Sequence, residues 1–203
     1  MKLIPTILSH SKEEFYKKYD ELVYFCEEIQ IDFMDGKFVN QISVQLKDIP
    51  LLDKSLTFEA HLMTLNPEEY INELAQKGFK RVFFHFEACE NHLEVAKKIK
   101  EKGMSPGLAI NPQTSLEKIR DLLEGFDRIL IMGVNPGKEN QDFIVSTKEK
   151  IGYLKNKIFV QVDGGINPET LKYVKNADAI NIGSFITGAN NPLKAFEEME
   201  KLL

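Results

Sequence analysis

Residues 28–36 read EIQIDFMDG, and polar residues alternate with apolar ones through this short segment. Side chains of a β-strand point to opposite faces in turn, so Gln30, Asp32 and Met34 share one face and the apolar residues between them share the other. In a barrel of parallel strands, the outward face packs on helices, whereas the inward face opens into an active-site mouth near the carboxyl ends. The alternation therefore predicts an amide and a carboxylate facing the inside of a barrel.

Similar strand-like runs recur along the whole chain. They are predicted at residues 2–8, 28–35, 56–63, 81–88, 105–111, 128–134, 158–165 and 179–184. Helical segments are predicted at 12–26, 67–78, 90–103, 115–126, 147–156, 168–176 and 192–203, with a weaker one, broken by Pro50, at 44–54. Eight β/α units without a linker predict an α/β fold in which residues 1–203 form one (β/α)₈ TIM barrel. A doubly wound open sheet is the alternative, because the number of strands separates the two folds.

Helix boundaries carry their own signals. Asn66, Asn167 and Asn191 each precede a proline, which is the pattern of an N-cap followed by the first helical residue. Gly78 and Gly103 are placed where helices should end.

Composition excludes several classes of partner. The net charge is -5, from 26 basic and 31 acidic residues spread along the chain, so no basic stripe is available for nucleic acid. Cys26 and Cys89 have no CxxC spacing and are expected to be free structural thiols of a reducing compartment. The apolar run at the N-terminus is too short for a signal sequence, and no run approaches the ~18 residues of a membrane span. We expect a cytosolic protein that binds neither membrane nor nucleic acid.

The inward positions of several predicted strands carry reactive groups. Gln30, Asp32, His61 and Asp163 are predicted to face one mouth, accompanied by Met34, Met63 and Met132. One inward polar residue is more often a satisfied core group, and methionines commonly fill gaps in a core. Two buried carboxylates are different, because each must find a cation, a metal or a proton. We therefore expect a functional site.

A second cluster suggests phosphate binding. The runs DGGI at 163–166 and IGS at 182–184 follow the seventh and eighth predicted strands, where barrels often hold phosphate on backbone amides. A tight turn explains either glycine run equally well when it is taken alone. Their occurrence after both strands favours a phosphate site.

The motifs, taken in order, resemble the ribulose-phosphate 3-epimerase family. They are PTILS, QIDFMDGKFV, EAHLM, HFEA, INP, MGVNPG, VDGGINPET and IGS, one from each predicted strand. The resemblance implies a barrel of the ribulose-phosphate-binding type. It also implies inversion of the carbon next to the carbonyl of a ketose phosphate, through an enediolate at a divalent metal such as zinc, manganese, iron or magnesium.

The resemblance also implies roles for particular residues. Asp32 and Asp163 would transfer protons and bind the metal together with His61, which also contacts the substrate. Met34, Met63 and Met132 would form a wall beside the intermediate. The remaining residues implied to contact the substrate or its phosphate are Thr6, Gly137, Gly164, Gly165, Gly183 and Ser184.

The chain departs from the family pattern at two places. Gln30 stands where the family has histidine, so the resemblance implies that the Gln30 oxygen replaces a nitrogen ligand of the metal and that the donor set shifts from zinc toward manganese or magnesium. Alternatively no metal binds and the two carboxylates share a proton. After Gly137 the chain reads KENQ in place of glycines, and Lys138 either supplies charge to a phosphate or is a solvated loop residue.

Three further histidines and one further carboxylate are not expected to take part in the reaction. His85 and Glu87 are expected to support the site, and His10 and His92 to lie at the surface.

Three functions remain open from the sequence. The first is a 3-epimerase of ribulose 5-phosphate and xylulose 5-phosphate, or of a related hexulose phosphate. The second is a non-catalytic relative that binds sugar phosphate with a degraded metal site, and the third is a Schiff-base aldolase. No predicted strand ends in the lysine that an aldolase needs. Self-association is possible, since it is common in this family.

Overall fold

Eight parallel strands close into a barrel in the computed structural model, which describes residues 1–137 and 140–203. The strands are β1 (Lys2–Ile7), β2 (Glu28–Met34), β3 (Thr57–Met63), β4 (Arg81–His85), β5 (Ser105–Ile110), β6 (Arg128–Met132), β7 (Phe159–Asp163) and β8 (Ala179–Ile182). Each strand pairs with the next along the chain, and β8 pairs with β1, so the sheet has no edge. The predicted barrel is confirmed, and the open-sheet alternative is excluded.

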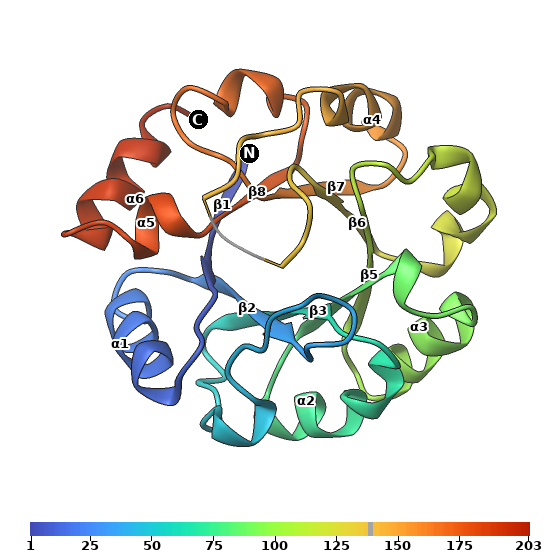
Figure 1. Ribbon diagram of the computed structural model, residues 1–203, viewed down its shortest axis with the longest axis horizontal. Coiled ribbons are helices and arrows are strands. Elements are labelled where there is room, and N and C mark those ends of the chain that lie inside the picture. The colour runs from blue at the N-terminus through green and yellow to red at the C-terminus, as the bar shows by residue number, and fades with distance from the viewer. Residues whose placement is uncertain (138–139) are drawn as a thin grey trace.

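Helices surround this ring of strands (Figure 1). The α-helices are α1 (Lys12–Leu22), α2 (Ile71–Lys77), α3 (His92–Glu101), α4 (Thr147–Leu154), α5 (Ser184–Thr187) and α6 (Pro192–Glu200). Short 3₁₀ helices are η1 (Leu46–Asp48), η2 (Pro67–Glu69), η3 (Phe86–Ala88), η4 (Leu116–Gly125) and η5 (Leu171–Tyr173). In the described part of the chain, none of these helices has the length and hydrophobicity that crossing a membrane requires.

Several helical predictions were wrong in type or length. The predicted helix at 44–54 is only the short turn η1, and the one at 115–126 is the 3₁₀ helix η4. The segment 168–176 keeps only η5, although Asn167 makes the side-chain contacts expected of an N-cap. Asn167 Oδ1 accepts the N–H groups of Glu169 and Thr170, and the Thr170 hydroxyl donates to the carbonyl of Gly165.

The predictions of helix caps were confirmed in part. The side chain of Asn191 accepts the N–H of Lys194 and caps α6 as expected. Asn66 instead adopts a left-handed conformation and caps nothing with its side chain. Gly78 ends α2 with φ of 102°, and Gly103 follows α3 with φ of 75°.

The outward strand faces and the helices form the main apolar core. Buried phenylalanine, isoleucine and leucine residues, among them Phe15, Phe58 and Ile151, pack between the two layers. Both cysteines are free, as predicted: Cys26 is buried in this core and Cys89 is half-buried.

The inside of the barrel is closed at its amino-terminal end by a network of ion pairs. Glu59 is fully buried and accepts hydrogen bonds from Arg81 Nη1 at 2.5 Å and Gln161 Nε2 at 2.6 Å. Arg81 Nη2 also binds Glu28 at 2.6 Å, and Arg128 binds Gln161 at 3.3 Å. A buried carboxylate satisfied in this way fills the barrel and leaves the carboxyl end for a site.

A second interior group closes the centre of the barrel. Phe83, Ala109, Leu130, Met132 and Val134 form an apolar cluster on the inward faces of the strands and the start of the next loop. Phe83 fits because Gly107 lies opposite it. A Cβ on Gly107 would meet the Phe83 ring at 2.2 Å. This contact makes glycine a packing requirement of β5.

Replacing Gly107 with alanine should therefore destabilise the barrel. We expect Gly107→Ala to lower the free energy of unfolding by about 1–3 kcal/mol, because Phe83 must leave its position. Urea unfolding followed by circular dichroism measures this change. Gly152→Ala is the matched control, since Gly152 lies in α4 with no atom within 4 Å of its added Cβ. That change should stabilise by about 0.5–1 kcal/mol. Equal effects of the two changes would contradict the packing argument.

Candidate active site

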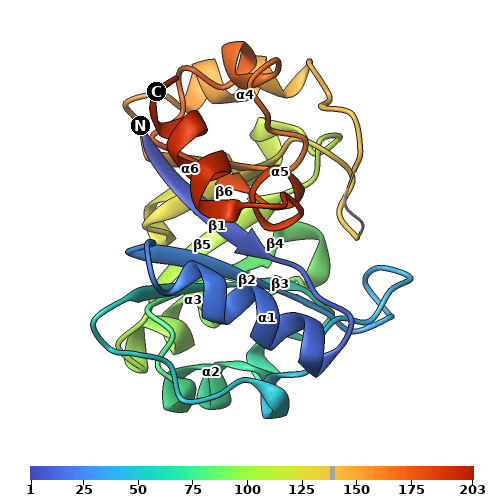
Figure 2. The same ribbon diagram turned by 90° about the vertical axis from the view of Figure 1, so that its left-hand side faces the viewer.

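A cavity of about 420 Å³ opens at the carboxyl ends of the strands. Figure 2 shows the loops that follow β2 and β6 projecting from this end of the barrel. These loops meet, because Gly137 lies against Val39, where an added Cβ would be 3.0 Å from the Val39 Cβ. The predicted site residues that line the cavity are Thr6, Asp32, His61, Met63, Met132, Gly137, Asp163, Gly164, Gly165, Gly183 and Ser184. Residues from six of the eight strands and their following loops therefore converge on one space.

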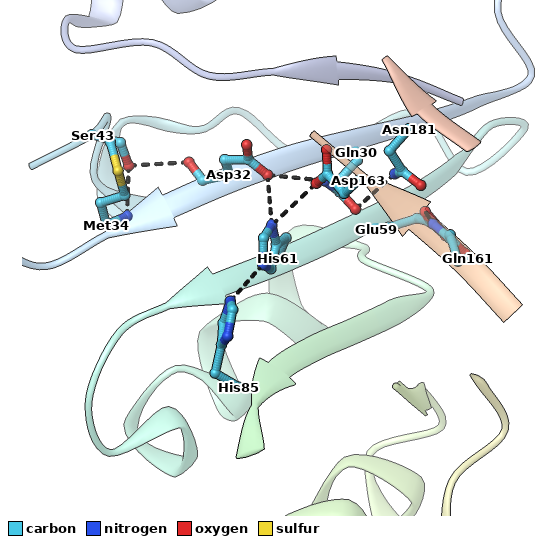
Figure 3. Close-up of polar contacts among 10 residues, drawn as sticks. All are labelled: Gln30, Asp32, Met34, Ser43, Glu59, His61, His85, Gln161, Asp163 and Asn181. Atoms are coloured by element: carbon cyan, nitrogen blue, oxygen red, sulfur yellow. Dashed lines mark hydrogen bonds and ion pairs between the residues drawn. The ribbon is translucent and has the colours of Figure 1, made fainter. Parts of the chain in front are cut away.

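The two predicted carboxylates both contact Nδ1 of His61 (Figure 3). Asp32 lies on the inward face of β2, Asp163 ends β7, and His61 lies on β3, the neighbour of β2. His61 Nδ1 is 3.1 Å from Asp32 Oδ1 and 3.4 Å from Asp163 Oδ2. Asp32 Oδ2 and Asp163 Oδ1 receive none of the hydrogen bonds found among the described residues. Each carboxylate thus keeps one oxygen for a ligand in the cavity.

Gln30 lies fully buried beneath this pair and contacts both carboxylates. Its Nε2 atom donates to Asp163 Oδ2 at 2.6 Å and to Asp32 Oδ1 at 3.0 Å. Its Oε1 atom accepts from Asn181 Nδ2 at 2.8 Å. In this arrangement the amide nitrogen, and not the oxygen that the sequence offered as a metal ligand, faces the carboxylates.

His85 and Glu87 extend the site on the far side of His61. His85 Nε2 is 2.9 Å from His61 Nε2, and His85 Nδ1 is 3.4 Å from Glu87 Oε2. An ionised carboxylate only accepts, so His85 carries its proton on Nδ1 and leaves Nε2 as an acceptor. His61 must then donate from Nε2. This series of hydrogen bonds leaves His61 Nδ1 facing the two carboxylates. There Nδ1 carries either a proton or a metal ion.

The pKa values of these groups agree with that order of donors. Burial lowers the pKa of His85 to about 4, which keeps the ring neutral. Burial acts to raise the pKa of Glu87, but hydrogen bonds from His85, Thr114 and the Asn111 N–H outweigh it and lower the value to about 2.

The pKa values of the central pair are shifted in the opposite direction. Burial raises the pKa of Asp32 to about 6, against the hydrogen bond from His61. Burial disfavours charge on His61 too, but its hydrogen bonds to Asp163 and Asp32 raise the pKa of the ring to about 9. The site therefore holds a positive charge between two carboxylates.

This donor set fits a divalent metal ion. One atom each from Asp32, His61 and Asp163 lies within 4.8 Å of the others, and all three residues are buried. Two carboxylate oxygens and one imidazole nitrogen match the ligand preferences of several divalent ions. A metal at His61 Nδ1 would take the place of the ring proton, and the contact with His85 orients the ring for that role.

The opposite end of the cavity carries free backbone donors. Gly164 and Gly165 have φ of 98° and 69°, and a Cβ on Gly164 would lie 2.4 Å from a methyl group of Val134. None of the hydrogen bonds among the described residues uses the N–H of Gly165 or of Ser184. These two amides are available to an anion in the cavity.

Two predicted positions fall outside this arrangement. Met34 is buried against Leu8, Val39 and Met63, and does not line the cavity as Met63 and Met132 do. Lys138 lies outside the described residues. The expectation of a surface position was also wrong for His92, which is buried and binds the carbonyl of Phe86 at 2.7 Å. His10 is exposed, as expected.

Asn181 lines the cavity but was not among the residues predicted from the sequence. It is buried on the inward face of β8, lines the cavity and binds Gln30. Its Oδ1 atom, like the hydroxyl of Thr6, has no hydrogen-bond partner among the described residues. The alternation in AINIGS at 179–184 places Asn181 on the same face as Gly183, and this signal could have identified it.

Comparison with known proteins also points to the ribulose-phosphate 3-epimerase family. The model of the ribulose-phosphate 3 epimerase family matches residues 2–187. Ribulose-phosphate 3-epimerase of Schizosaccharomyces pombe is 32% identical over 94% of this chain and 89% of its own length. The cytoplasmic isoform of Oryza sativa is 32% identical over 98% and 93%. The crystal structure of Streptococcus mutans KGPDC in complex with D-R5P superposes with a TM-score of 0.79, at 13% identity, over 98% of this chain and 95% of that one.

The closed barrel and its carboxyl-end site are those of a (β/α)₈-barrel enzyme. Within that class, the chain belongs to the ribulose-phosphate 3-epimerase family, whose reaction is an isomerisation. The resemblance drawn from the motifs is confirmed.

Glu87 provides a test of the support behind His61. Its carboxylate is ionised above about pH 2 in the folded protein and above about pH 4.5 as a free side chain. A lowered pKa contributes stability above pH 4.5 and loses it as the pH falls toward 2. We expect Glu87→Gln to unfold more easily than the native chain by about 2 kcal/mol at pH 7, after allowance for solvent screening.

Urea unfolding at pH 7, 5 and 3 measures this difference. The gap between native chain and variant should stay constant from pH 7 to pH 5 and fall to less than half by pH 3. A gap that is unchanged at pH 3 would show that Glu87 acts through packing and not through its charge.

Proposed function

We propose that the protein interconverts D-ribulose 5-phosphate and D-xylulose 5-phosphate, with Asp32 and Asp163 as its two proton-transfer groups. One observation carries the proposal. Two carboxylates from β2 and β7, three strands apart around the ring, face one cavity and keep one oxygen each free toward it. The names of the relatives support the choice of substrate.

Inversion at a carbon next to a carbonyl needs a base on one side and an acid on the other. Each group must come within hydrogen-bond reach of the carbon-bound proton. Asp32 and Asp163 approach the cavity from different strands, so a ketose placed between them presents opposite faces to the two carboxylates. One carboxylate removes the proton of carbon 3 and the other, in its acid form, returns a proton to the opposite face.

The charge of the intermediate requires stabilisation. Asp32, His61 and Asp163 would hold a divalent metal, which supplies positive charge to the substrate oxygens when it is bound. His85 keeps His61 in the tautomer with Nδ1 toward the carboxylates. Manganese, zinc, iron and magnesium all accept such ligands.

Other groups that line the cavity, both backbone and side chain, are proposed to hold the substrate. The free N–H groups of Gly165 and Ser184 are proposed to bind the phosphate, assisted by close approach at Gly164 and Gly183. Met63 and Met132 form an apolar wall, and the unpartnered hydroxyl of Thr6 is proposed to bind a substrate hydroxyl. Gly137, in the loop after β6, lines the cavity and lies against Val39.

Proton NMR in deuterated water tests the reaction directly. Ribulose 5-phosphate is incubated with the protein, and we expect deuterium at carbon 3 as xylulose 5-phosphate appears. Binding of ribulose 5-phosphate without exchange or product would contradict the proposal and indicate a non-catalytic relative.

Replacing either aspartate should separate proton exchange from epimerisation. We expect Asp32→Asn and Asp163→Asn each to lower the rate of epimerisation about 10³-fold, because one of the two proton transfers is lost. Each variant should still exchange the carbon 3 proton of one epimer, and the two variants should act on opposite epimers. Exchange of the same epimer by both variants would contradict the assignment of two separate faces.

Metal removal tests the role of His61 and the carboxylates as ligands. Dialysis against a chelator should lower kcat, and manganese or zinc should restore it, since the charge of the intermediate is then compensated. Elemental analysis of the dialysed protein provides the control. Full activity of a protein shown to be free of metal would instead support two carboxylates that share a proton.

A further inference from the structure

The strongest unexplained feature of the site is the amide of Gln30. The residue is fully buried, its amide nitrogen has two carboxylate partners, and its amide oxygen has an amide donor as partner. The two N–H bonds reach Asp163 Oδ2 at 2.6 Å and Asp32 Oδ1 at 3.0 Å, and Oε1 accepts from Asn181 Nδ2 at 2.8 Å. Figure 3 shows Gln30 and Asp163 between Asp32 on the left and Asn181 on the right.

The reverse orientation of this amide is chemically unfavourable. It would place Oε1 against two carboxylate oxygens and the NH₂ group against the NH₂ group of Asn181. The hydrogen-bond network, which is the basis for assigning amide orientations, therefore selects one orientation. In this orientation Gln30 Oε1 accepts from Asn181 Nδ2.

This orientation of the Gln30 amide affects how the two carboxylates are held. Asp32 Oδ1 and Asp163 Oδ2 are bridged by Gln30 Nε2 and again by His61 Nδ1. Two like charges so close repel unless a donor or a cation lies between them. The bridges hold these two inner oxygens and leave the outer oxygens free toward the cavity.

We propose that Gln30 and Asn181 form a positioning pair that sets the separation and rotation of the two reactive carboxylates, and that Gln30 is not a metal ligand. The inference rests on the proposed function in that it concerns the same aspartates. It explains how a site with an amide at position 30 keeps both carboxylates ordered. Asn181 acts through Gln30, and Gln30 acts through Asp32 and Asp163.

A spectroscopic experiment tests the pair without using turnover. In ¹H–¹⁵N spectra of metal-free protein, the side-chain NH₂ signals of Gln30 are identified by their loss in Gln30→Leu. We expect both protons shifted downfield and protected from exchange, because each donates to a carboxylate. They should keep their protection when zinc is added, and Asn181→Leu should shift them.

Kinetics provide the second readout. Gln30→Leu should lower kcat at least tenfold with KM changed less than threefold, since the substrate contacts remain and the carboxylates lose their alignment. Gln161→Leu is the matched control, because Gln161 is another buried inward amide that contacts Glu59 and neither reactive carboxylate. Circular dichroism verifies that all variants fold.

The outcomes separate the two proposals. Gln30 NH₂ signals typical of a free amide, or loss of their protection when zinc binds, would overturn the positioning pair. Unchanged signals in Asn181→Leu would overturn the role of Asn181. A kcat equal to that of the native chain in Gln30→Leu would also overturn the inference. Protected signals in a protein that fails to epimerise ribulose 5-phosphate would retain the pair and reject the proposed substrate.

Discussion

Two buried carboxylates that share one imidazole nitrogen form the interaction on which the rest of this structure depends. Asp32 and Asp163 are each only 7% exposed, so water screens their repulsion weakly and the fold must supply donors or a cation between them. His61 supplies one donor atom and Gln30 the other. The repulsion between the two carboxylates destabilises the fold, and the same pair of carboxylates suits the site to binding a metal ion and to proton transfer.

The interior of the barrel divides into a part that stabilises and a part that binds. At the amino end, Glu59 accepts hydrogen bonds from Arg81 and Gln161, and this network closes the barrel. At the carboxyl end, polar atoms of Thr6 and Asn181 remain without partners among the described residues. Buried polar groups are usually paired, so unpaired ones beside a cavity mark the end where a ligand completes the structure.

Complementary hydrogen bonds order the groups around His61. The amide of Gln30 donates twice and accepts once. Asn181 on β8 satisfies the one atom that the carboxylates cannot use. Behind His61, the pair of His85 and Glu87 orients the ring through donors and acceptors alone. Orientation therefore comes from complementary hydrogen bonding on both sides of the imidazole.

The residue pattern alone predicted the eight strands, the inward faces of β2, β3 and β7, and many of the residues that line the cavity, because strand alternation and glycine placement are local properties. It predicted a helix at 168–176, where only the short 3₁₀ helix η5 forms. The hydrogen bonds of Gln30 to Asp163 and to Asn181 depend on the tertiary structure. Those contacts join strands 133 and 151 residues apart in the chain, and no local pattern specifies which way a buried amide turns.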